Sequence, residues 1–250
     1  MSHDRPPHEA GDHAAPAPAT SDHPHGVSAG HGHGQAGGHG QRPDADAFFD
    51  EAAATWDDDP AKVERSRIVA DAIADAVPLT PRTRALEYGG GTGAVGRHLA
   101  GRLGDLVLAD ASAGMVAAAG AAIAAEELAR ARAIRLDLTR DPVPDERFDV
   151  VLTVMALHHV PDVARVLAGF REVLAPGGWV AICDLDSDPG GHFHDREFDG
   201  HHGFSRATVA ELLRAAGFAE PAFSTPHVVV KESETGTRDF SLFLAVARRD

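Results

Sequence analysis

A short apolar segment that ends in a glycine-rich turn constrains this chain more than any other feature. Residues 85–88 read Ala-Leu-Glu-Tyr, the glycines Gly89, Gly91 and Gly93 follow, and residues 94–100 have a helical pattern. Glycine lets a backbone approach a ligand closely, and the free N–H groups of a helix N-terminus attract negative charge. A strand, a turn of this kind and a helix therefore predict a cradle for a nucleotide-type cofactor.

The turn alone does not identify the cofactor. Gly91, Gly93 and Gly96 also satisfy the dinucleotide pattern GxGxxG. Asp110, at the end of the next predicted strand, is placed to bind a ribose in either case. A tight turn with only a structural role is the third interpretation.

Composition limits the kind of protein. The chain has 250 residues, 43% of them hydrophobic, which suffices for one large α/β domain with an appendage. A formal net charge of −15 argues against a nucleic acid partner. The only cysteine, Cys183, excludes a disulfide framework. The first six residues lack the apolar segment of a secretory signal, and the longest apolar run, Val150–Leu157, is too short to span a membrane. We predict a cytoplasmic protein.

The first 43 residues differ in composition from the rest. They contain eight histidines, many Gly, Pro and Ala residues and almost no large apolar side chains. Such a segment cannot bury enough surface to offset the entropy of ordering, so we predict a disordered tail for residues 1–43. Its histidine pairs, such as His23 and His25, leave two interpretations open: a segment that binds transition metals, or a solubilising tail whose metal binding is loose and adventitious.

Folding is predicted to begin at residue 44, with a helical region over residues 44–80. Phe48 and Trp56 fall on one face of a first helix, which an Asp-Asp-Asp-Pro segment ends before a second helix over residues 61–76. One interpretation is ordinary helices that face the core. The other is a flap, anchored by Phe48, Phe49 and Trp56, that closes over the cofactor and brings Trp56 to the substrate.

From residue 83 onward, strand-like and helix-like segments alternate. The predicted strands are 85–88, 106–110, 133–137, 148–154 and 179–184, and the helices between them are 94–103, 112 to about 129, and 162–174. This alternation predicts a doubly wound, Rossmann-like α/β fold with a parallel sheet, helices on both faces and ligands at the carboxyl ends of the strands. A helix over 205–216 then leads into a closing antiparallel hairpin, with strands 222–231 and 239–248.

Four ordered motifs resemble those of the class I S-adenosylmethionine-dependent methyltransferases, in particular the small bacterial enzymes. They are Leu86–Gly93, Leu108–Met115, the segments 148–151 and 156–162 with Asp137 before them, and Leu174–Gly178. The resemblance spans residues 48 to 248 and implies a seven-stranded sheet, mostly parallel, with an antiparallel C-terminal strand. It implies a methyltransferase domain over residues 44–250 that methylates a small molecule. One departure is Glu87, where the family most often has Asp.

The resemblance also implies a role for each cofactor-binding residue. Glu87 helps to organise the end of the site that holds the methionine ammonium group, and Asp110 accepts hydrogen bonds from the two ribose hydroxyls. Asp137 accepts the adenine amine while Leu138 offers its backbone N–H. The predicted cofactor set is completed by Ala111 and Met115, which flank the adenine, and by Val154 at the end of the fourth strand.

Two adjacent histidines follow the fourth strand, His158 and His159. Methyl transfer is an in-line displacement, in which the protein mainly aligns the reacting atoms. A base is needed only if the nucleophile arrives protonated, and we predict His159 for that role. The alternative is that the pair has only a structural role.

A predicted substrate-side loop over residues 187–204 is rich in histidines and acidic residues. Three interpretations are open: a polar substrate pocket, a metal site, or a solvated loop. We assign His194, His201 and His202 to the substrate together with His158, and predict no metal ligand.

Two rival functions remain. An NAD-dependent oxidoreductase is disfavoured by the order of the four motifs and by the closing hairpin. A non-catalytic protein that binds a cofactor or a metal on the same fold is the other rival, because a fold does not fix a function.

Overall fold

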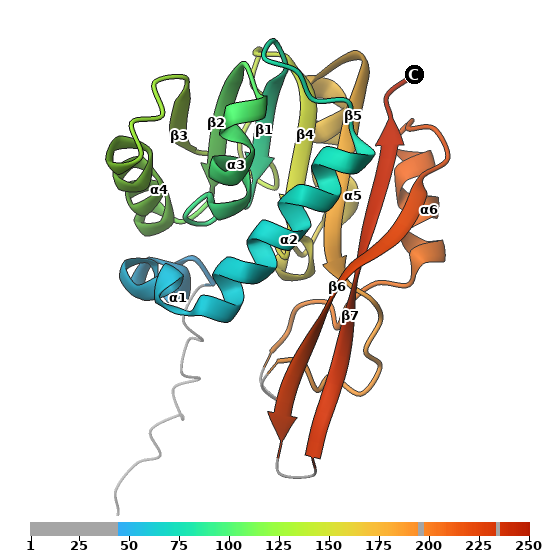
Figure 1. The fold of residues 1–250 in the computed structure, drawn as a ribbon. Helices are drawn as coiled ribbons and strands as arrows, with labels where there is room; N and C mark the ends of the chain where they lie inside the picture. Colours follow the sequence, from blue (N-terminus) through green and yellow to red (C-terminus); the bar gives the residue numbers. More distant parts are fainter. Residues whose placement is uncertain (1–44, 195–197, 234–235) are drawn as a thin grey trace, which may run out of the picture. The chain divides into compact units, whose positions relative to one another are not determined.

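A seven-stranded sheet lies at the centre of the computed structural model, which describes residues 45–194, 198–233 and 236–250 (Figure 1). The strand order is β3-β2-β1-β4-β5-β7-β6. The first five strands along the chain pair in parallel, whereas β7 pairs antiparallel with both of its neighbours. This arrangement confirms the predicted doubly wound α/β fold with an antiparallel C-terminal strand.

Each strand overlaps a predicted strand, although β5 begins at Leu174 and not at the predicted residue 179. The seven strands are β1 (Arg84–Tyr88), β2 (Asp105–Asp110), β3 (Ala131–Arg135), β4 (Phe148–Val154), β5 (Leu174–Leu185), β6 (Ala222–Ser233) and β7 (Gly236–Arg248). The parallel strands end at one edge of the sheet, the lower edge in Figure 1, where β5 ends. Residues that follow β1, β2, β4 and β5 are therefore brought together at that edge.

Helices cover both faces of the sheet. They are α1 (Ala45–Ala52), α2 (Pro60–Ala76), α3 (Ala94–Leu99), α4 (Ala113–Ala125), α5 (Val163–Val173) and α6 (Arg206–Ala215), with short 3-10 helices η1 (Ala53–Asp58), η2 (Ala100–Arg102) and η3 (Leu157–His159). Buried side chains of α2, α3 and α4 pack on one face, and those of α5 and α6 pack on the other. Both faces of the parallel strands are therefore shielded, which explains their almost continuous apolar sequences.

The third strand is displaced from its prediction. β3 begins at Ala131 and ends at Arg135, two residues earlier at each end than the predicted 133–137. Asp137 therefore follows the strand instead of ending it. Its carboxylate accepts hydrogen bonds from the Thr139 N–H at 2.9 Å and the Thr139 hydroxyl at 2.6 Å. Such a local side-chain turn competes with the strand ladder.

The helix after β2 is shorter than predicted. It ends at Ala125, where Glu127 takes a left-handed backbone with φ of 53° and the Leu128 N–H donates to the Ile123 carbonyl. Helices usually end in this way at a glycine. The sequence contains no glycine there, so the end could not be recognised.

The first predicted helix is also divided. α1 ends at Ala52, and Trp56 lies on the separate 3-10 helix η1. Phe48, predicted as an anchor of the flap, is 59% exposed, so it does not anchor the segment. Phe49 and Trp56 are half-buried.

Some predictions fall beyond what the structure describes. The tail over residues 1–43, with its predicted disorder and metal binding, lies outside the described residues, as do residues 195–197 of the substrate-side loop. Among the described helices, none combines the length and apolar character needed to cross a membrane.

Candidate functional site

The glycine-rich turn joins the carboxyl end of β1 to α3. Gly91 and Gly93 both have left-handed backbones, with φ of 58° and 77°. A Cβ on Gly93 would overlap the Leu108 side chain, and one on Gly91 would lie 3.7 Å from the Met115 sulfur and 3.8 Å from Trp56 Nε1. The turn therefore needs glycine for its conformation and brings Met115 and Trp56 against its outer surface.

Two predicted acids hold this turn from neighbouring strands. Glu87 Oε2 accepts a hydrogen bond from the Gly96 N–H at 2.8 Å. Asp110 Oδ2 accepts one from the Gly91 N–H at 2.8 Å. The other oxygen of Asp110 accepts from the Ser112 N–H at 2.9 Å. Both carboxylates thus organise the backbone that would surround a ligand.

Glu87 is almost completely buried, with 1% of its surface exposed. Burial raises the pKa of its carboxyl group to about 8, although the hydrogen bond from Gly96 acts in the opposite direction. At neutral pH the side chain is therefore mainly protonated. A positive charge placed nearby would lower this pKa and favour the ionised form.

The third predicted acid lies beside a tyrosine. Asp137 is half-buried after β3, and the N–H of the next residue, Leu138, donates to the Tyr88 hydroxyl at 3.2 Å. This N–H was predicted to contact adenine, and it would have to leave the Tyr88 hydroxyl to do so. Tyr88, at the end of β1, was not recognised from the sequence.

The remaining predicted cofactor residues lie around the same strand ends. Ala111 directly follows Asp110, and its carbonyl accepts a hydrogen bond from Arg135 Nε at 2.9 Å. Met115 is buried beside the turn. Val154 ends β4 and is partly buried against the core. We call the region formed by the turn and these residues the cofactor side.

The helical region before β1 is tied to the cofactor side by two acids that sequence reasoning did not single out. Asp50 Oδ1 accepts hydrogen bonds from the Ser112 hydroxyl at 2.6 Å and the Gly114 N–H at 2.8 Å. The Ser112 hydrogen bond is the largest cause of the lowered pKa of Asp50. Asp57 Oδ1 accepts from the Thr92 hydroxyl at 2.7 Å. The predicted flap is therefore fastened to the start of α4 and to the glycine turn.

Aromatic rings connect this flap to the histidines after β4. The Phe49 ring makes edge contacts with Trp56 and with His159, at centroid distances of 5.7 and 5.1 Å. Trp56, predicted to contact substrate, thus lies beside the glycine turn, and Phe49 lies between it and His159.

A buried histidine–carboxylate pair joins η3, which follows β4, to the end of β5. His158 Nδ1–H donates to Asp184 Oδ1 at 2.6 Å, and the His158 backbone N–H donates to Asp184 Oδ2 at 3.2 Å. His158 is 1% exposed and Asp184 is fully buried. Because the carboxylate fixes Nδ1 as the donor, the neutral ring keeps its lone pair on Nε2.

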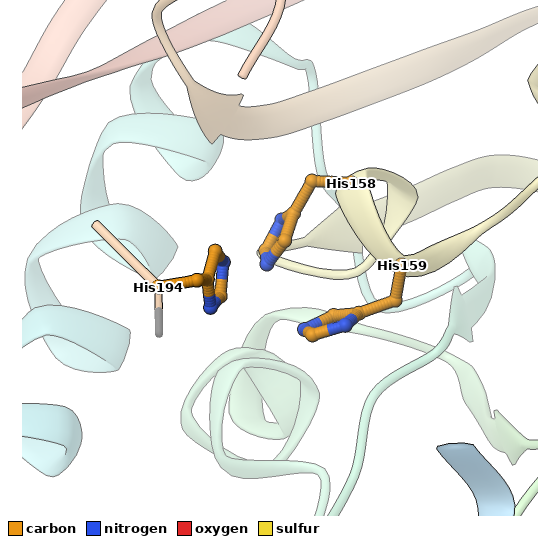
Figure 2. A group of neighbouring side chains, drawn as sticks. All are labelled: His158, His159 and His194. Carbon is orange, nitrogen blue, oxygen red and sulfur yellow. The ribbon is translucent and has the colours of Figure 1, made fainter. Parts of the chain in front are cut away.

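Three imidazole rings converge beside this pair. Figure 2 shows His158 and His159 of η3 facing His194, which comes from the loop after β5. Ring centroids are 4.2 Å apart for His158 and His159, and 5.0 Å apart for His158 and His194. Burial, and next the neighbouring His158, lower the pKa of His159 to about 3 and that of His194 to about 4. We call these three rings, together with Asp184, the acceptor side, because the sequence predicted the histidines to face the molecule that accepts the methyl group.

The other two histidines predicted to bind substrate have different surroundings. His201 Nε2–H donates to the Val160 carbonyl at 3.0 Å. The His202 ring lies at the edge of Phe198, 5.7 Å between centroids. Among the described residues, the converging ring nitrogens belong to His158, His159 and His194.

Two features of the acceptor side were missed from the sequence. Asp184 lies near the end of β5. An acid at the carboxyl end of a strand was the signal that identified Glu87 and Asp110, and the same signal could have identified Asp184. Met155, directly after β4, has a left-handed φ of 53°, and its N–H donates to the Cys183 carbonyl at 2.8 Å. A strained residue of this kind redirects the chain toward η3 and gives no signal in the sequence.

Comparison with known proteins identifies relatives. The family model described as "Methyltransferase domain" matches residues 61–220. The 27-O-demethylrifamycin SV methyltransferase of Amycolatopsis mediterranei is 31% identical over 144 residues, which cover 52% of this chain and 49% of that protein. The demethylmenaquinone methyltransferase of Clavibacter sepedonicus is 29% identical over 145 residues, which cover 57% and 58% of the two chains. This chain thus spans about half the length of these relatives.

A solved structure has the same fold. Phosphoethanolamine N-methyltransferase 2 of Haemonchus contortus, in complex with S-adenosyl-L-methionine, aligns with a TM-score of 0.57 at 16% identity. The alignment covers 71% of this chain and 51% of that one. At this identity the likeness concerns the fold alone.

Proposed function

The chain belongs to the methyltransferase-domain family, and we propose that it transfers a methyl group from S-adenosylmethionine to a small-molecule acceptor. Support comes from the match over residues 61–220 and from the seven-stranded sheet with its antiparallel β7. The two relatives named above are methyltransferases whose names specify demethylrifamycin SV and demethylmenaquinone. Both are small molecules, which supports the same class of acceptor here.

The observation that carries the proposal is the position of Asp110 at the glycine turn. Its two oxygens are held by the N–H groups of Gly91 and Ser112, which supports a fixed carboxylate at the turn where we propose that the ribose binds. A carboxylate in that position accepts the two ribose hydroxyls. Asp137 and Leu138 after β3 are the proposed adenine contacts. Glu87 supports the turn that receives the methionine end.

The proposed reaction is a single displacement. A nucleophilic atom of the acceptor forms a bond to the methyl carbon while the bond from that carbon to the sulfonium sulfur breaks. The products are the methylated acceptor and S-adenosylhomocysteine. If the nucleophile carries a proton, the proton passes to a base, for which we propose His159. Alignment and the exclusion of water, to which Trp56 and Phe49 contribute, supply the remaining acceleration.

Calorimetry on the purified full chain tests the cofactor. We expect S-adenosylmethionine to bind with an affinity in the usual range of about 1 μM to 1 mM, and NAD to show no binding. Binding of NAD in place of S-adenosylmethionine would support the oxidoreductase instead. A labelled-methyl assay with a cell extract then identifies the acceptor, and binding without transfer to any extract component would favour a non-catalytic protein.

His159→Gln tests the base. We expect the turnover number to fall by about 10²–10⁴-fold, the usual contribution of acid–base catalysis, with unchanged affinity for S-adenosylmethionine. His98→Gln, at an exposed position of α3, is the control. An unaltered turnover number and pH profile in His159→Gln would remove His159 from this role.

Partners and location follow from charge and cysteine content. With a net charge of −15, we propose no nucleic acid partner, because phosphates would be repelled. The only cysteine, Cys183, is buried as a free thiol, which suits the reducing cytosol. We therefore propose a cytoplasmic protein.

A further inference from the structure

Three histidine side chains from two separate loops converge on one point of the acceptor side. From these residues we propose that His158, His159 and His194 bind a divalent transition-metal ion such as Zn²⁺. Each ring offers one nitrogen, and the three nitrogens lie within 4.8 Å of one another (Figure 2). The sequence led us to predict no metal ligand here, because spacing cannot show that side chains from different loops meet.

The ligand set suits such an ion. Imidazole nitrogens are preferred ligands of Zn²⁺, Co²⁺ and Ni²⁺, and three histidines with one open position are typical of catalytic zinc sites. Bonds of about 2.05 Å in tetrahedral geometry place the ligand nitrogens about 3.3 Å apart. The distances between the ligand nitrogens therefore need to shorten by about 1.5 Å at most.

One of the three rings already has a carboxylate behind it. Metal-bound histidines almost always donate their other N–H to a carboxylate or carbonyl, which fixes the ring orientation. His158 does so: its Nδ1–H donates to the fully buried Asp184, which leaves Nε2 for the ion. The negative charge of Asp184 also offsets part of the charge of a bound cation.

An independent observation concerns His194. Its Nε2 is buried and has no hydrogen-bond partner among the described residues. A buried ring nitrogen without a partner is costly, and a native structure normally explains it by a water or an ion. The ring stacks on Phe198 at a centroid distance of 3.9 Å, so its orientation is fixed by packing.

This inference deepens the proposed function and rests on it for the role of the ion. An ion held by three rings has an open position for a hydroxyl or phenol oxygen of the acceptor. Coordination favours loss of the proton from that oxygen, and the proton passes to solvent. The resulting oxyanion is the nucleophile. When the ion is bound, His159 is one of its ligands, and the role of His159 as a base applies to the chain without the ion.

Metal binding is tested without cofactor or acceptor, on the full-length chain. The tail histidines form a background, so a tail-silenced chain is needed in which eight residues are changed to Gln: His3, His8, His13, His23, His25, His31, His33 and His39. We expect this chain to bind about one Zn²⁺ in calorimetry. Co²⁺ should give the visible absorption spectrum of a low-coordinate nitrogen site.

Variants in the tail-silenced chain connect the binding to the three rings. His194→Gln should abolish the Co²⁺ spectrum and the stoichiometric Zn²⁺, and His98→Gln should leave both intact. Asp184→Asn should weaken Zn²⁺ binding by about 10–100-fold, the usual effect of losing a carboxylate behind a ligand. Circular dichroism on each variant verifies folding, and His194→Gln replaces a half-buried side chain, so it tests the site even if Asp184→Asn does not fold.

The outcomes separate the two proposals. If the tail-silenced chain binds no Zn²⁺, or if His194→Gln binds it equally well, the metal site is overturned. If S-adenosylmethionine still binds in that case, the proposed methyl transfer is unaffected. If Zn²⁺ binds as expected but S-adenosylmethionine does not bind, the proposed function fails while the metal site stands.

Discussion

On the cofactor side, carboxylates accept hydrogen bonds from backbone N–H groups, whereas on the acceptor side imidazole rings from two loops face one another. Glu87 and Asp110 each hold an N–H of the glycine turn or of the helix that follows it. By contrast, His194 has a buried Nε2 without a partner among the described residues. The backbone of the cofactor side is therefore fixed by its own hydrogen bonds, whereas the acceptor side keeps a buried ring nitrogen that a bound ligand can use.

This difference bears on how each side tolerates change. Backbone positions on the cofactor side are fixed by hydrogen bonds and by left-handed glycines, so small changes there should cost stability as well as binding. On the acceptor side, His159 and His194 are held mainly by packing, whereas His158 is bonded to Asp184. Changes at His159 and His194 should alter turnover or metal binding with little effect on the fold or on the affinity for S-adenosylmethionine.

Glu87 should produce the largest effect, seen as a pH dependence of stability. Its carboxyl has a pKa of about 8 in the folded chain and the ordinary 4.5 when unfolded, so the folded state binds an extra proton between these values. The stabilisation is complete below about pH 4.5 and is lost as the pH rises through about 8, a loss on the order of 5 kcal/mol. Urea denaturation from about pH 5 to about pH 8 measures this slope.

Glu87→Gln should flatten that slope, and the exposed Glu64→Gln should not. S-adenosylmethionine should also flatten it in the wild-type chain, because its ammonium group favours the ionised Glu87. Equal slopes for the wild-type chain and Glu87→Gln would show that this acid is not the source of the pH dependence.

Gly93→Ala should have the next largest effect. The substitution places a Cβ on a backbone with φ of 77° and into the Leu108 side chain. We expect it to lower the free energy of unfolding by about 2–4 kcal/mol. Gly101→Ala is the matched control, because an added Cβ there has open space around it. Equal stabilities for the two variants would mean that the turn is not rigid.

Asp110→Asn should act mainly on the cofactor. The amide keeps one acceptor oxygen but loses the charge, so we expect the affinity for S-adenosylmethionine to fall by about 10–100-fold in calorimetry. Asp105→Asn, at the other end of β2, should bind normally. A large fall in the turnover number at saturating cofactor, with unchanged affinity, would instead place Asp110 on the acceptor side.

Asp50→Ala should have the smallest effect. The side chain accepts hydrogen bonds from Ser112 and Gly114 in an exposed position, where single interactions contribute little. We expect dissociation of S-adenosylmethionine, followed by stopped-flow fluorescence, to be about two- to fivefold faster. Glu51→Gln is the neighbouring control. If the rate does not change, the flap is a structural segment and not a cover for the cofactor.

The positions of the cofactor-side residues in the fold could be predicted because the signals for them are local. Each acid lies at or near the end of an apolar strand. The glycines indicate a left-handed backbone conformation that other residues rarely adopt. Alternation of strands and helices then brings these ends to one edge of the sheet. Even the error in β3 left Asp137 at that edge, because the displacement was only two residues.

The acceptor side could not be predicted to the same extent, because it depends on contacts between distant loops. His194 and His201 lie seven residues apart in one loop, yet one ring joins His158 and the other bonds the Val160 carbonyl. Which ring turns inward is decided by packing on Phe198 and by the turn at Met155. Neither the packing on Phe198 nor the turn at Met155 can be recognised from the spacing of residues in the sequence.

The bond between Asp184 and His158 makes one ring of the acceptor side an extension of the central sheet. Asp184 Oδ1 accepts from the Leu185 N–H at 2.8 Å as well as from the ring, and Oδ2 accepts from the His158 backbone. Rotating that imidazole would break contacts that also fix the end of β5. Among the described residues, no hydrogen bond holds His194 Nε2, so we expect the loop that carries His194 to adjust to bound molecules of different size.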